Sequence, residues 1–181
     1  MDLKLAYSSI FLGLNIHKQL FVYISMSELG YPDGIYQYIF NTALFVHPTH
    51  IYTGFYYGMR SSGIMGIALY ATSLNYWKYP LLNSYRRTID MIVAKSTIAY
   101  HFYLSLYTTN KLFTTLPICV GSGLYFVSIY LEKKKYTKIA AFCHCLLHTL
   151  VSIGASFTYR DYYWNRSLLE YPSAIQFLSF L

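Results

Sequence analysis

The chain has 181 residues, of which 55% are hydrophobic and only 12% are charged. A soluble domain carries about twice that share of charged residues, so the composition argues against a water-soluble globule and predicts a protein surrounded by lipid. The net charge of +7 does not indicate a nucleic-acid partner, because the basic residues lie in short segments between apolar runs. In that position they set the orientation of membrane helices.

Residues 1–34 are predicted to form an interfacial segment, with a helix that lies on the membrane surface. Apolar side chains such as Leu12, Ile16 and Leu20 recur at helical spacing, whereas Asn15 and Lys18 are polar. This two-faced pattern is typical of surface-lying amphipathic helices. The glycines and the proline of residues 30–34 then end the segment.

The next two segments, Ile35 to Met59 and Ser62 to Trp77, are predicted as membrane helices. The first contains Pro48, which membrane helices tolerate when neighbouring groups repair the missing backbone bond. Trp77, at the end of the second, is expected to be an anchor at the membrane interface. The second also carries small residues four apart, a row that favours close helix contact: Gly58, Ser62 and Gly66.

The segment Ile89 to Tyr107 is the most polar of the predicted spans. Asp90 and His101 are eleven residues apart, which returns them to within roughly 20° of each other on a helix. Polar groups on one stripe of a membrane helix face protein or water rather than lipid. The stripe comprises Asp90, Ala94, Thr97, His101, Ser105 and Thr108.

Two further spans are predicted, Leu112 to Leu131 and Ile139 to Tyr159, followed by a short tail over residues 160–181. The last span carries His144 and His148 on one helical face, one turn apart. The predicted fold is therefore an all-α integral membrane bundle over residues 35–159, with about five transmembrane helices. If the segment of residues 35–59 does not cross fully, the bundle has four helices and the N-terminus changes sides.

The distribution of basic residues predicts the orientation of this bundle. With five spans, nine lysines and arginines lie on the side of the N-terminus and four on the opposite side. The positive-inside rule then places the N-terminus on the cytosolic side of the membrane. The organelle is not indicated by the sequence.

Three parallel spans bring histidines to a similar depth, at roughly 1.5 Å of rise per residue. His47, His101 and His148 come out roughly 17, 18 and 13 Å into the bilayer. Several imidazoles at one level suit a zinc site, with zinc-bound water as the nucleophile, a b-type haem held between two helices, or a proton or ion path lined by His and Asp. They also suit purely structural hydrogen bonds to tyrosine. Asp90 is expected either to orient a ligand or act as a base, or to pair with Arg86 and Arg87.

The combination of Ser73, Asp90, and His144 with His148 resembles the superfamily of alkaline ceramidases and progestin receptors. That resemblance implies an intramembrane zinc hydrolase that cleaves lipid amides. It implies His144 and His148 as zinc ligands, with Ser73 and Asp90 in the catalytic site. The chain departs from the family at Trp77, where a histidine ligand is expected, so His101 is predicted to supply the third ligand. The family also has seven spans.

Two functions follow from these observations. The first is a non-enzymatic subunit or scaffold of a membrane assembly, whose partners are the lipid bilayer and other membrane subunits. The alternative is a zinc-dependent lipid hydrolase with His101, His144 and His148 as ligands and Asp90 and Ser73 in the catalytic site. A haem-binding subunit is a third possibility. The incomplete ligand set favours the non-enzymatic function.

Overall fold

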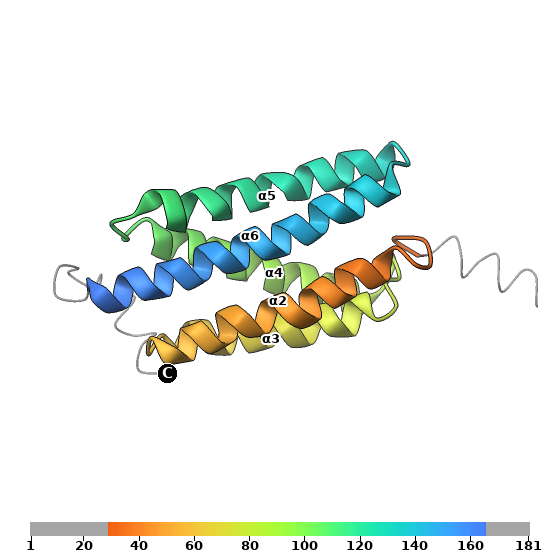
Figure 1. Ribbon diagram of the computed structural model, residues 1–181. Coiled ribbons are helices and arrows are strands. Elements are labelled where there is room, and N and C mark those ends of the chain that lie inside the picture. The colour runs from red at the N-terminus through yellow and green to blue at the C-terminus, as the bar shows by residue number, and fades with distance from the viewer. Residues whose placement is uncertain (1–28, 166–181) are drawn as a thin grey trace, which may run out of the picture.

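The computed structural model describes residues 29–165, which form a bundle of five α-helices. The helices alternate in direction and are joined by short turns (Figure 1). The all-α prediction is confirmed for this part of the chain, and α5 and α6 are long and apolar enough to cross a membrane. The elements are α2 (Tyr36–Tyr56), α3 (Arg60–Trp77), α4 (Tyr85–Ser105), α5 (Lys111–Lys133) and α6 (Thr137–Trp164).

The predicted interfacial helix falls mainly on residues 1–28, outside the described residues, and so does the tail from residue 166. Within the bundle the predicted segments match the helices, but two ends differ clearly. α4 begins at Tyr85 because Ser84 caps it: the Ser84 backbone is extended and its Oγ accepts a bond of 3.3 Å from the Arg87 backbone N–H. Such a cap satisfies one of the free N–H groups at a helix start. α6 continues to Trp164, five residues beyond its predicted end.

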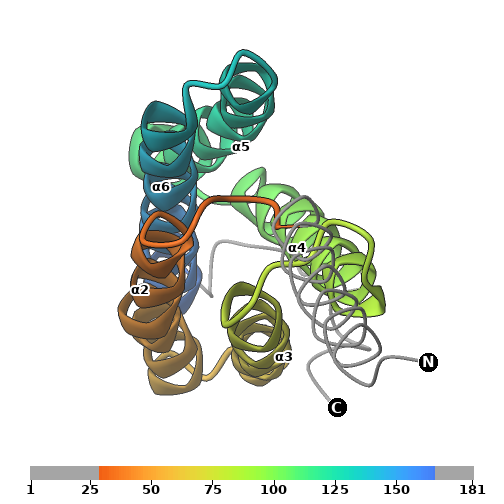
Figure 2. The same ribbon diagram turned by 90° about the vertical axis from the view of Figure 1, so that its right-hand side faces the viewer.

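The helices form an arc when the bundle is seen end-on (Figure 2). α5 packs along α6, α6 along α2, α2 along α3, and α3 along α4. α4 thereby faces α5 and α6 across the interior of the bundle, against which it packs less extensively than against α3. This arrangement leaves room for the cavity described below.

Glycines allow the backbones of neighbouring helices to approach closely. A Cβ atom on Gly66 of α3 would lie 2.8 Å from His50 Nε2 of α2, and one on Gly154 of α6 would lie 2.9 Å from the Thr114 carbonyl oxygen of α5. Ser62 is fully buried. The predicted packing row is therefore confirmed at Ser62 and Gly66, whereas Gly58 lies in the turn before α3 with a φ of 73°.

The polar stripe of α4 faces the interior, as predicted. Its hydrogen-bonding members are buried: Asp90, Thr97, His101, Ser105 and Thr108. The surface, by contrast, is apolar on every helix. Each of the five carries at least one large hydrophobic side chain that is about half exposed or more: Phe45, Ile64, Ile92, Phe126 and Phe142.

One end of the bundle, which we call the lysine-rich end, brings together the start of α2, the α3–α4 turn and the α5–α6 turn (Figure 1). The segment before α2 is joined to the α3–α4 turn by a bond of 2.8 Å from Gly30 N–H to the Pro80 carbonyl. The basic residues of these turns and the adjoining helix ends are Lys78, Arg86, Arg87, Lys133, Lys134, Lys135 and Lys138. At the opposite end lie Arg60, Lys111 and Arg160.

Candidate functional site: a cavity lined by histidines

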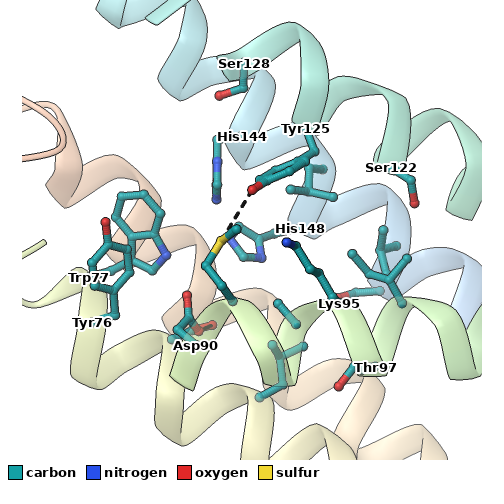
Figure 3. A pocket seen from close by; sticks show the side chains of 18 of the residues that line it. Tyr76, Trp77, Asp90, Lys95, Thr97, Ser122, Tyr125, Ser128, His144 and His148 are labelled. Atoms are coloured by element: carbon teal, nitrogen blue, oxygen red, sulfur yellow. Dashed lines mark hydrogen bonds between the residues drawn. The ribbon is translucent and has the colours of Figure 1, made fainter. Parts of the chain in front are cut away.

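A cavity of about 790 Å³ lies between the helices and takes lining residues from all five. Figure 3 shows Asp90 and Lys95 of α4 on one side of it and His144 and His148 of α6 on the other. Two lining residues, Phe102 of α4 and Phe126 of α5, are themselves 39% and 70% exposed. Because both line the cavity and reach the surface, the cavity opens between α4 and α5 on the apolar flank of the bundle.

Ser73 and Asp90 form a buried pair that joins α3 to α4 on the wall of the cavity. Ser73 Oγ donates to Asp90 Oδ1 over 2.7 Å, and both side chains are buried. The alternative of an ion pair between Asp90 and its neighbours is not what the structure has: Arg86 donates to the carbonyls of Asn75 and Tyr79, and Arg87 to that of Leu82. The hydroxyl therefore supplies the partner that a buried carboxyl requires.

Five histidines from three helices follow one another in a row that runs along the cavity. The ring centroids are 5.0 Å apart from His144 to His148, 4.9 Å from His148 to His47, 5.6 Å from His47 to His50, and 6.0 Å from His50 to His101. All five rings line the cavity. We call this set the histidine row.

At one end the histidine row continues into hydroxyl groups. His101 Nε2 is hydrogen-bonded to the Tyr159 hydroxyl, and His101 Nδ1 donates over 2.7 Å to the Thr97 carbonyl. That second bond fixes which ring nitrogen carries the proton, so Nε2 accepts from tyrosine. The neighbouring Tyr100 ring contacts His101 at 5.4 Å, and its hydroxyl bonds to Ser61 Oγ over 3.1 Å.

Several imidazole nitrogens in the middle of the row have no hydrogen-bond partner among the described residues. They are both nitrogens of His47, Nε2 of His50 and Nε2 of His148. His50 Nε2 faces Gly66, while its Nδ1 bonds to Ser152 Oγ over 3.2 Å. A buried polar atom without a partner costs about 1–3 kcal/mol. His47, only 2% exposed, therefore carries two such nitrogens in a ring that lines the cavity.

The described residues do not fit the predicted zinc centre. His144 and His148 are neighbours, but His101 lies at the far end of the row, beyond His148, His47 and His50. Within residues 29–165, no group of three or more His, Cys, Asp or Glu side chains is placed to hold a metal ion. The zinc set and the catalytic assignment of Ser73 and Asp90 stay predictions.

Trp77, at the position where the resemblance predicts a histidine ligand, is not an interface anchor. It is 4% exposed, and its ring contacts His144 at 4.9 Å and Tyr31 at 5.8 Å. The anchor prediction was wrong because Tyr31, from the segment before α2, folds over the indole. The rings that meet across helices, His47 with His148 and His50 with His101, touch edge to face, so neither pair leaves a gap between its rings for a haem iron. The haem-binding function stays a prediction.

Two members of the site were not predicted to be functional from the sequence, His50 and Tyr159. His50 lies three residues after His47, so a helix that continues through Pro48 places both histidines on one face. The spacing could therefore have identified His50. Tyr159 lies fifteen residues after His144 on α6. The sequence has 22 tyrosines, and no spacing or motif distinguishes Tyr159 from the others.

No protein-family model, no curated protein and no solved structure matches this chain. The resemblance to the ceramidase and progestin-receptor superfamily therefore stays a prediction carried by a few residues. The function of the site is therefore inferred from its geometry.

Proposed function

We propose that this chain is a multi-pass integral membrane protein that holds a lipid-like molecule in its central cavity and catalyses no reaction. The observation that carries the proposal is the cavity of about 790 Å³, which reaches the apolar surface between α4 and α5. Ligand pockets of about 300–1,000 Å³, mostly apolar with a few placed polar groups, are typical of small-molecule sites. An opening on an apolar flank admits a molecule dissolved in the bilayer.

The apolar surface supports the membrane location. Soluble monomers rarely expose large contiguous apolar patches, yet every helix here has exposed large hydrophobic residues, including Phe45 at 72%. Helices α2 to α4 carry more polar residues than α5 and α6. Some of these residues are buried, as with Ser73 and Asp90. Others, such as Asn41 and Lys95, are exposed. The support for a membrane location is therefore strongest at α5 and α6, which are long and apolar enough to span a bilayer.

The basic residues support an orientation in which the lysine-rich end faces the cytosol. The described turns and adjoining helix ends carry seven lysines and arginines at that end and three at the other, an asymmetry that the positive-inside rule associates with the cytosolic side. A small non-enzymatic membrane component that assembles with other subunits is compatible with this topology.

Lipid retention tests the proposal. The full chain is extracted in mild detergent and its mass is measured intact, with Ala94→Phe as the cavity-filling variant and Ala68→Phe as the matched control. Ala94 lines the cavity, whereas Ala68 is an exposed residue of α3. We expect a lipid-sized adduct on the wild type and on Ala68→Phe that is lost from Ala94→Phe.

Two results would contradict the proposal. The first is equal retention by both variants, which would mean that lipid binds elsewhere. The second is release of the full chain from membranes by alkaline carbonate, which frees proteins that do not span the bilayer. Incubation of the same preparation with lipid amides and esters supplies a third readout, because turnover would establish a hydrolase.

A further inference from the structure

We infer that the histidine row is a proton path through the bundle. The inference shares with the proposed function the membrane location of the helices, but it does not depend on a bound lipid. It starts from the five imidazoles in succession, His144, His148, His47, His50 and His101, with neighbouring ring centroids 4.9–6.0 Å apart.

The length of the histidine row is comparable to the thickness of the hydrocarbon core of a bilayer. From His144 to Tyr159 it follows α6 for fifteen residues, or about 22 Å at 1.5 Å per residue. The hydrocarbon core of a bilayer is about 30 Å thick. The row therefore covers most of the distance over which a proton could not cross unaided.

Both ends of the row lead toward water. At the lysine-rich end the cavity extends to Gly30 and Leu82 in the terminal segments and takes in charged side chains. The charged groups that line it are Arg87, Asp90 and Lys95 from α4 and Glu132 from α5, while α2, α3 and α6 contribute no charged lining residue. At the opposite end His101 bonds to Tyr159, and Tyr100 reaches Ser61, which is partly exposed at the start of α3.

The chemistry of imidazole suits such a path. A neutral imidazole accepts a proton on one ring nitrogen and releases one from the other, so one proton enters the row for each that leaves, and no bond other than N–H or O–H changes. Among the described residues, both nitrogens of His47 and Nε2 of His148 have no hydrogen-bond partner, and both rings line the cavity. Bridging water, which we propose for this part of the cavity, would carry protons between rings too far apart to touch directly. Rows of His and acidic residues in membrane helices serve this purpose in pumps and transporters.

Proton flux into liposomes tests the inference. The full chain is reconstituted into phosphatidylcholine vesicles with a trapped pH-sensitive dye, and valinomycin with a potassium gradient sets the membrane potential. His47→Phe removes both nitrogens from the middle of the row while keeping a ring of similar size, and it breaks no hydrogen bond among the described residues. Met91→Leu is the matched control, because Met91 lines the same cavity but is not a member of the row; the change removes only the weak bond of 3.4 Å from the Tyr125 hydroxyl to Met91 Sδ.

We expect the wild type and Met91→Leu to change the internal pH at least several-fold faster than protein-free vesicles, and His47→Phe to fall to the protein-free rate. His47→Gln keeps a polar side chain and serves if the phenylalanine variant does not fold. Equal fluxes in the wild type and a folded His47 variant would overturn the inference. So would a wild-type flux no faster than that of empty vesicles. A chain that does not insert into vesicles at all would overturn the membrane location, and with it both proposals.

Discussion

Gly154 lies where α6 meets α5, and its replacement by alanine tests the packing of these two helices. The added Cβ would come within 2.7 Å of Ile118 Cγ1, 2.9 Å of the Thr114 carbonyl oxygen and 3.3 Å of the Ile118 backbone nitrogen. Ordinary contacts between such atoms are about 3.5–4.0 Å. Since two of the three atoms belong to backbone, α5 has to move away rather than a side chain rotate.

Such overpacking lowers the free energy of unfolding by about 1–3 kcal/mol. The higher helix propensity of alanine than of glycine raises it by about 0.8–1.0 kcal/mol. We therefore expect Gly154→Ala to lower the free energy of unfolding by up to about 2 kcal/mol, and by about 1 kcal/mol at the middle of these two ranges. Gly123→Ala in α5 is the matched control, because no atom lies within 4 Å of its added Cβ. That variant should gain about 0.5–1 kcal/mol.

The measurement is unfolding of the detergent-solubilised protein by increasing dodecyl sulfate, followed by the circular dichroism of the helices. The midpoints of Gly154→Ala and Gly123→Ala should move in opposite directions from the wild type. If Gly154→Ala proved as stable as Gly123→Ala, α5 and α6 would not pack at this register, and the position of the cavity wall would have to be revised.

Three further predictions use the same unfolding assay. Ser84→Ala removes the cap of α4 and should cost about 1 kcal/mol; an unchanged midpoint would mean that α4 starts elsewhere. Asp161→Ala removes the carboxylate that accepts hydrogen bonds from the backbone N–H and the hydroxyl of Thr109. The free energy of unfolding should fall by about 1 kcal/mol. An unchanged midpoint would show that these bonds do not hold α6 to the α4–α5 turn. Lys135→Gly should stabilise by about 1 kcal/mol, because Lys135 has a φ of 64° that glycine adopts freely; a loss of stability would contradict that backbone.

The helices were predictable because their determinants are local in the sequence. The polar stripe of α4 and the small residues at the start of α3 each specify which face is buried, and the structure buries both faces. The sequence pattern predicts the start of α4 four residues too late, because hydropathy does not detect a capping residue such as Ser84. Which helices pack side by side around the arc depends on contacts between residues far apart in the sequence, so no local pattern predicts it.

The site was only partly predictable for the same reason. Depth along parallel spans predicts His47, His101 and His148 at one level, and this prediction was wrong in part. The structure brings them into one row, but the row runs along the bundle: His101 bonds to Tyr159, which lies eleven residues along α6 from His148, or about 16 Å at 1.5 Å per residue. Depth also gives no rotation of one helix about its axis, so the inward turn of Trp77 beneath Tyr31 was not predictable from it.

The uneven attachment of α4 has a mechanical consequence. Near the α4–α5 turn, Lys111 Nζ and Thr115 Oγ1 both donate to the Ser105 carbonyl, over 3.0 and 3.2 Å. Toward the lysine-rich end the two helices are linked by the bond of 3.4 Å from the Tyr125 hydroxyl to Met91 Sδ (Figure 3), and a thioether is a weak acceptor. Among the described residues, α4 and α5 are therefore held together more firmly at their connecting turn than toward the lysine-rich end, so we expect their separation to vary more easily at that end.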